Sequence, residues 1–243
     1  MTDGDADRPD DDGADPDAFA PVTDPDPADR VEGWPLALRG VTESVVTTLG
    51  PNDRWNAAAL GLHTPDGPVD RGSDAPAAAT TWGNTRTRRN FRRQGGGVIQ
   101  FVSDPRTFVA AALTIHEVEA PVLPDAHAWA EVRAERVDAG EEGGTRWEEW
   151  RLRPVRAAAP DPTVPRINRG FAAVIEATVA ASRLDVPAYD SEALLARLRR
   201  YADVVDRCGG RPERAAFATL DAETGWRERL ADADAADVVR FDP

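Results

Sequence analysis

Between residues 40 and 155, apolar and β-branched residues occur in short runs separated by turn-forming residues. This alternation is typical of β-structure. Strands are predicted at residues 40–49, 55–63, 80–82 and 98–102, and in a long hairpin that pairs 128–137 with 145–155. Two short helices are predicted between the strands, over residues 85–94 and 104–113. Short strands joined by local turns favour a β-barrel over a parallel α/β sheet.

After a breaker rich in Ala and Pro at residues 157–162, the spacing of apolar residues becomes helical. One apolar stripe is formed by Phe171, Val174, Ile175, Thr178 and Val179. A second helix is predicted from the N-cap Asp190 to the Gly209–Gly210 pair, and a third begins at Pro212. These signals predict a helical segment that follows the barrel.

The predicted fold class is therefore α+β, with four parts along the chain. They are an acidic tail over residues 1–33, a barrel over 34–157, a helical C-terminal domain over 163–222 and a second acidic tail over 223–243. The first tail holds eleven Asp among its first thirty residues, interleaved with Pro, Gly and Ala. Such a segment buries too little apolar area to offset its ordering entropy, so we expect it to be disordered.

The charge balance limits the classes of partner. The net charge is −14, and all 29 basic residues are Arg. This balance argues against a protein that binds the backbone of nucleic acids generally. An acidic surface without Lys stays hydrated where molar salt screens charges, so a halophilic source is predicted. A GC-rich genome would give a similar bias through its codons, and the sequence leaves this alternative open.

No apolar run approaches the roughly 20 residues of a membrane helix, and the first five residues lack a secretory pattern, so we expect a cytoplasmic protein. The three His residues, at 63, 116 and 127, are widely spaced and predict no metal site. Cys208 precedes two glycines at a helix end, where we expect a buried small residue and not a nucleophile. The Glu pairs at 141–142 and 148–149 are interpreted as solvated charge, and the sequence leaves open a role as paired carboxylates.

The segment 82–93 carries the clearest chemical signal. Five of its eight residues from Arg86 to Arg93 are Arg, and Thr85 and Thr87 lie at the start of the predicted helix. Free backbone N–H groups and the positive dipole end make a helix N-terminus suitable for an anion such as a terminal phosphate. The alternative is an amphipathic helix whose arginines pair with surface carboxylates. The pattern alone leaves both readings open.

Several short motifs resemble one known family. They are Ser44–Thr48, Asn56–Leu62, Thr85–Phe91, Val98–Phe101 with Asp104–Pro105, and Ile167–Phe171 at the start of the helical part. Together they are similar to an archaeal domain-of-unknown-function family with an FMN-binding split barrel, related to flavin reductases and pyridoxamine-phosphate oxidases. The resemblance extends over roughly residues 41–217. Ala59 stands where relatives often carry Pro, near the loop expected to approach the flavin ring.

The resemblance implies FMN as the cofactor. Its Ser/Thr-x-Thr-x-x-Asn element, which holds the FMN phosphate, corresponds here to Thr85, Thr87 and Asn90, and the barrel-strand Asn corresponds to Asn56. The candidate cofactor-binding residues are therefore Asn56, Thr85, Arg86, Thr87 and Asn90. A homodimer with flavin at the subunit interface is also implied.

Three functions are compatible with these observations. The first is a flavin-dependent oxidoreductase or flavin reductase that uses a nicotinamide or deazaflavin electron donor, with no general acid or base named. The second is a non-catalytic protein that carries or senses flavin. The third is a module that binds nucleic acid or an acidic partner through its Arg-rich helix.

Overall fold

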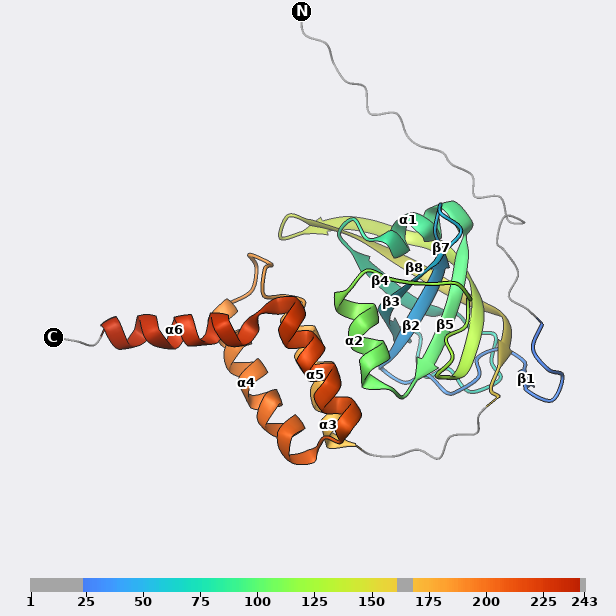
Figure 1. The fold of residues 1–243 in the computed structure, drawn as a ribbon. Coiled ribbons are helices and arrows are strands. Elements are labelled where there is room, and N and C mark those ends of the chain that lie inside the picture. The colour runs from blue at the N-terminus through green and yellow to red at the C-terminus, as the bar shows by residue number, and fades with distance from the viewer. Residues whose placement is uncertain (1–23, 161–167, 241–243) are drawn as a thin grey trace, which may run out of the picture.

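The computed structural model describes residues 24–160 and 168–240, with side chains described as far as residue 233 (Figure 1). Its strands are β1 (Arg30–Val31), β2 (Val41–Leu49), β3 (Trp55–His63), β4 (Ala77–Trp82), β5 (Gly96–Val102), β6 (His116–Val118), β7 (Ala126–Glu142) and β8 (Thr145–Ala158). Its helices are α1 (Arg86–Gln94), α2 (Pro105–Leu113), α3 (Arg169–Ala181), α4 (Ser191–Cys208), α5 (Arg211–Thr224) and α6 (Trp226–Arg240).

The strands form a closed antiparallel barrel. The sheet runs β8-β4-β3-β2-β5-β7, and β7 pairs with β8 again, which closes a barrel of six strands. β1 adds to the edge of β8, and β6 adds to one end of β3. This confirms the α+β class, with a barrel followed by helices.

Most of the predicted strands have the predicted positions. β2 and β3 pair along their whole length, from Val41 opposite His63 to Leu49 opposite Trp55. The β7–β8 hairpin is longer than predicted, because the charged residues 138–142 continue the ladder and the turn is left to Gly143 and Gly144. Both glycines have positive φ, which a tight turn requires and which glycine adopts without steric cost.

Alternate residues of the strands fill the barrel. Val46, Leu62, Ile99 and Leu152 are completely buried in one apolar cluster. Phe91 of α1 closes this cluster at one end, with its ring centroid 5.1 Å from that of Trp150 in an edge-to-face arrangement. Such pairs contribute roughly 0.5–1.5 kcal/mol beyond the area they bury. Helix α1 is therefore fixed to the barrel through its apolar face.

The ends of α1 and α2 follow local sequence rules. Thr85 caps α1 by accepting a hydrogen bond from the backbone N–H of Arg88 at 3.2 Å, and Gly95 ends the helix in the left-handed region at φ 67°. Asp104 caps α2 in the same way, with the N–H of Arg106 at 2.8 Å. The Arg106 guanidinium lowers the pKa of the Asp104 carboxyl. In both helices the cap is the first residue of the range predicted from the sequence.

The helical domain shares its core with α2. Val109 of α2 is completely buried in a cluster with residues of the C-terminal helices, among them Val174, Leu198, Leu220 and Trp226. The Asp190 cap of α4 is confirmed, since its carboxylate accepts hydrogen bonds from the N–H groups of Glu192 and Ala193. Helix α2 thus joins the barrel to the helical domain.

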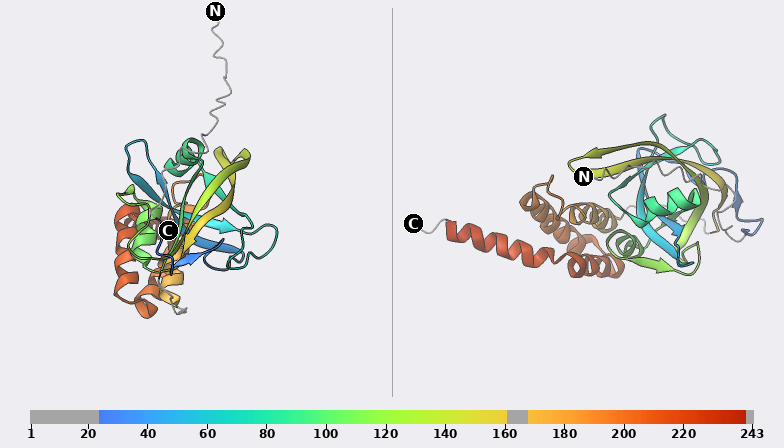
Figure 2. Two further views of the ribbon diagram at one scale, coloured as in Figure 1. Left: turned by 90° about the vertical axis from the view of Figure 1, so that its right-hand side faces the viewer. Right: turned by 90° about the horizontal axis from the view of Figure 1, so that it is seen from above.

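Two of the predicted boundaries are corrected. The segment expected as an acidic tail over 223–243 contains α6, which leads away from the barrel (Figure 2). Trp226, at the start of α6, packs edge-to-face on Phe217, and the two ring centroids are 6.0 Å apart. Within the segment expected to be disordered, Arg30 and Val31 pair with Ala158 and Ala157 of β8. Residues 1–23 of that segment lie outside the described residues.

Replacing Phe91 by Ala tests the closure of the barrel. We expect the free energy of unfolding to fall by about 3–5 kcal/mol, because a large buried ring is removed and a cavity remains. Urea denaturation in molar salt, followed by tryptophan fluorescence, measures the loss. The control Phe91→Leu keeps most of the buried volume and should lose clearly less. Equal stability of the Ala variant and the parent protein would contradict the packing described here.

Candidate functional site

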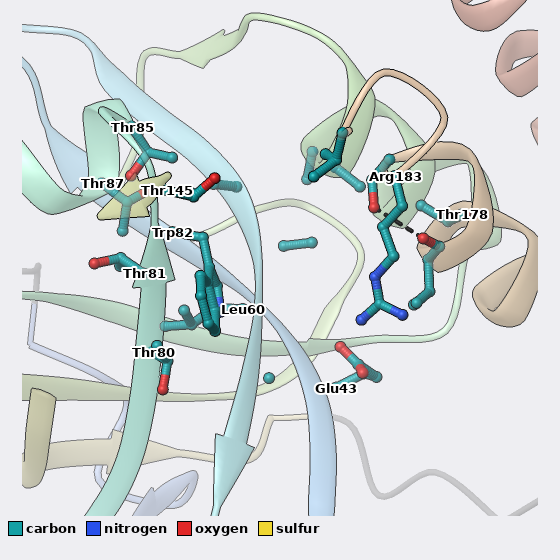
Figure 3. Close-up of a pocket in the computed structure, with 18 of the residues that line it drawn as sticks. Glu43, Leu60, Thr80, Thr81, Trp82, Thr85, Thr87, Thr145, Thr178 and Arg183 are labelled. Carbon is teal, nitrogen blue, oxygen red and sulfur yellow. Dashed lines mark hydrogen bonds between the residues drawn. The ribbon is translucent and has the colours of Figure 1, made fainter. Parts of the chain in front are cut away.

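A cavity of about 730 Å³ lies between the barrel and the helical domain (Figure 3). Cavities that bind small molecules commonly enclose about 300–1,000 Å³. One wall is formed by β3, β4, the N-terminus of α1 and the tip of the β7–β8 hairpin. The other is formed by α2, the C-terminal end of α3 and the segment that leads to α4. The cavity is therefore large enough for a mononucleotide.

The cavity opens on an unpaired stretch of β3. β6 covers this edge of β3 only from Trp55 to Ala57, and β4 pairs with it only at His63 opposite Ala78. Within the described sheet, residues 58–62 therefore have no strand partner on the side that faces away from β2. Residues 58–61 line the cavity. In an antiparallel ladder only alternate residues turn their backbone groups away from the paired strand, and the Leu60 carbonyl already accepts a hydrogen bond from the Ser44 hydroxyl at 2.6 Å. The other outward-facing backbone groups of this stretch can satisfy the polar edge of a planar ligand.

The N-terminus of α1 reaches the same cavity. Thr85 and Thr87 both line it, and Thr87 is buried, with 4% of its surface exposed. Among the described residues, the Thr87 hydroxyl has no hydrogen-bond partner. The first backbone N–H groups of the helix and its dipole favour an anion at this position. A terminal phosphate is therefore suited to this end of the cavity.

The other three candidate residues do not line the cavity. Asn90 is buried and donates to the hydroxyl of Thr48 at 2.9 Å, which ties α1 to β2. Arg86 forms an ion pair with Glu117 of β6. Asn56 is buried in β3 between its ladder partners Thr48 and Glu117. The structure thus brings Thr85 and Thr87 together at the cavity and places Asn56, Arg86 and Asn90 in the layer behind it.

The arginines of α1 hold the helix on the barrel. Arg92 binds the carboxylate of Glu148, with its Nε 3.2 Å from Oε2, and the Nε of Arg88 lies 3.9 Å from the same carboxylate. The Glu148 side chain is only 4% exposed. The interpretation of Glu148 as solvated charge is therefore wrong, because the paired strand β4 and helix α1 cover it. The structure therefore shows that Arg86 and Arg92 pair with carboxylates within the fold.

Polar groups on the second wall were not predicted. Arg183 and Tyr189 line the cavity from the α3–α4 segment, and the Arg183 guanidinium carbon lies 5.0 Å from the centre of the Tyr189 ring. Glu43 lies at the cavity from β2, and its pKa is raised, chiefly by partial removal of its carboxyl from water, with Glu176 adding and His63 opposing. No local motif marks these residues, since the packing of the helical domain on the barrel brings them together.

The last features singled out in the sequence are the cysteine, a possible metal site and a possible membrane helix. Cys208 is exposed, which corrects the expectation of a buried residue, because it lies at the free end of α4. Within the described ranges, no group of three His, Cys, Asp or Glu side chains is arranged to hold a metal ion. None of the described helices is both long and apolar enough to cross a membrane.

The structure has a closed barrel, with helix α1 packed over one end and a cavity at an open strand edge. These features define a split-barrel protein with a C-terminal helical domain. Residues 42–159 match the model of the DUF447 N-terminal domain, and residues 168–221 match that of DUF447, a protein of unknown function. The chain belongs to the DUF447 family. This confirms the resemblance found in the sequence. No protein among the curated ones matches the chain.

Among solved structures, one family member shows the same fold, and others are similar over about half of the chain. An FMN-bound DUF447 protein from Methanosarcina mazei superposes with a TM-score of 0.61 at 23% identity, over 76% of this chain and 96% of that one. A flavoredoxin from Methanosarcina acetivorans gives a TM-score of 0.36 at 12% identity, over 51% of this chain and 72% of that one. The styrene monooxygenase flavin reductase from Pseudomonas putida gives 0.34 at 12% identity, over 51% and 83%.

The Arg92–Glu148 pair is tested by Arg92→Gln. We expect the free energy of unfolding to fall by about 1.5–3 kcal/mol, because a buried carboxylate loses its charge-assisted hydrogen bonds. Chemical denaturation measures the change. The matched control is Arg89→Gln on the same helix, whose exposed side chain binds only a backbone carbonyl. If both variants lose equally little stability, the assignment of Glu148 as the anchor of α1 is wrong.

Proposed function

We propose that this chain binds FMN in the cavity between the barrel and the helical domain and acts as a flavin-dependent oxidoreductase. The observation that carries the proposal is the meeting of two unsatisfied surfaces in one cavity. They are the open edge of β3 at residues 58–61 and the N-terminus of α1 with the hydroxyl of Thr87. The FMN-bound family member from Methanosarcina mazei supports the choice of ligand.

The residues present fit this cofactor chemically. A phosphate needs donors at one end, and Thr85, Thr87 and the first N–H groups of α1 would supply them. An isoalloxazine ring needs an apolar surface and partners for its polar edge, and the open edge of β3 at residues 58–61 would supply backbone groups beside Trp82. The candidates Asn56, Arg86 and Asn90 would act behind the site, by holding β3, β6 and α1 in place.

When bound, FMN supplies hydride or single-electron transfer, so the chain itself needs no general acid or base. Its residues would bind the phosphate, orient the ring against β3 and exclude water through the helical wall. Phe108 and Ala111 of α2 form the apolar part of that wall. The electron donor in this proposal is a nicotinamide or deazaflavin coenzyme.

Thr87→Ala tests the phosphate end of the cavity. We expect the dissociation constant for FMN to rise about ten- to a hundredfold, since a charge-assisted hydrogen bond contributes about 1.5–3 kcal/mol. Titration of the apoprotein, followed by quenching of FMN fluorescence, measures the constant. Thr87→Ser keeps the hydroxyl and should retain most of the affinity.

Thr64→Ala, in the loop after β3 and away from the cavity lining, is the matched control and should bind as the parent protein does. An equal dissociation constant for Thr87→Ala and the parent would contradict the proposed phosphate site. A parent protein that does not bind FMN would contradict the proposed function as a whole.

The proposal includes a homodimer. Several large apolar side chains remain exposed on the single chain, among them Val41, Trp82, Ile115, Val137 and Val155. Trp82 is 49% exposed and lines the cavity, so a second copy would cover apolar surface next to the site. Light scattering in molar salt is expected to give about twice the chain mass of 26.2 kDa. A mass equal to one chain would contradict the dimer.

A further inference from the structure

The cavity has polar groups on both of its walls. The barrel wall carries the open edge of β3 and the threonines of α1, which account for one mononucleotide in the proposed function. The helical wall carries Thr178, Ser182, Arg183 and Tyr189. In Figure 3, Arg183 lies on the side of the cavity opposite Thr85 and Thr87. In the proposed function, the phosphate of the mononucleotide lies at α1. The helical wall therefore offers a second set of contacts, which this phosphate does not use.

Arg183 is the one Arg among the described residues that line the cavity, and the chain has no Lys. Its guanidinium lies over the Tyr189 ring, 5.0 Å from the ring centre. Within the described residues it forms no salt bridge, whereas Arg86 and Arg92 of α1 are paired with Glu117 and Glu148. An aromatic ring beneath a guanidinium holds it in place and leaves its N–H donors free.

Arg183 has no salt-bridge partner among the described residues although the chain has a net charge of −14. Carboxylates are plentiful on the surface, and Glu43 and Glu142 line the same cavity. The planar donor fork of Arg matches the two oxygens of a phosphate or carboxylate. An anionic ligand that enters a strongly acidic protein needs such a local cation, because the overall field repels it.

We propose that Arg183, supported by Tyr189, binds the anionic group of a second ligand, a redox coenzyme whose phosphate or carboxylate meets the helical wall while its reactive ring faces the flavin. This inference rests on the proposed function, because it assumes that FMN occupies the barrel wall. Arg183 and Tyr189 belong to the α3–α4 segment, so the helical domain takes part in choosing the partner coenzyme.

The test measures binding of oxidised coenzymes to FMN-loaded protein, so no turnover is involved. Isothermal titration calorimetry is carried out with oxidised NADP and, separately, with an oxidised deazaflavin coenzyme. We expect one of the two to bind the parent protein, and Arg183→Gln to weaken that binding about tenfold. Arg183→Lys keeps the charge without the donor fork and should give an intermediate affinity. The coenzyme that binds identifies the source of the anion.

The matched control is Arg200→Gln, which removes the same charge from an exposed position on α4 outside the cavity. It should bind coenzyme as the parent does. FMN affinity is measured for each variant and should stay unchanged in Arg183→Gln. If Arg183→Gln instead weakens FMN, Arg183 holds the flavin phosphate and the inference is wrong.

If FMN binds but neither coenzyme does, or if coenzyme binding is equal in Arg183→Gln and the parent, the inference fails while the proposed function stands. If the parent does not bind FMN, both fail.

Discussion

The divergence of β3 from β4 is the constraint on which the cavity depends. The two strands pair only at His63 and Ala78, and β6 covers only the opposite end of β3, so residues 58–62 keep an unpaired edge within a barrel that is otherwise closed. Unpaired backbone groups are costly unless water or a ligand satisfies them. Helix α1 begins beside this edge, because Phe91 packs into the barrel and Arg92 binds the buried carboxylate of Glu148. The anion-binding end of the helix and the open strand edge thus come to share one cavity.

The helical domain completes the cavity and does not merely follow the barrel. Val109 of α2 is buried among the C-terminal helices, while Phe108 of the same helix packs on β2 and β3 residues such as Val45 and Ala57. One helix therefore transmits the position of the helical domain to the barrel wall. This coupling sets Arg183 and Tyr189 against the cavity. In the account proposed here, the barrel binds the flavin and the helical domain selects what reaches it.

Features that depend on a few neighbouring residues could be predicted from the sequence. The helix starts at Thr85 and Asp104, the Asp190 cap and the bounds of β2 and β3 are of this kind. Features that depend on distant partners could not. β1 exists because it pairs with residues 157–158, and the helical start of the predicted acidic tail is fixed by the packing of Trp226 on Phe217.

The same division applies to the site. Thr85 and Thr87 were found because a helix start is a local signal, and both line the cavity. Arg183 was missed because only the packing of two domains places it there. The roles of all five candidates in holding a cofactor stay predictions, and the contacts of Arg86 and Asn90 show how these two residues support the walls.

Hydrogen–deuterium exchange with and without FMN tests the central claim most directly, because it reports on backbone amides one segment at a time. The account predicts that FMN slows exchange in two segments, the open edge at residues 58–62 and the first turn of α1 at residues 86–88. Unchanged exchange at both segments, or protection confined to a different part of the chain, would contradict it.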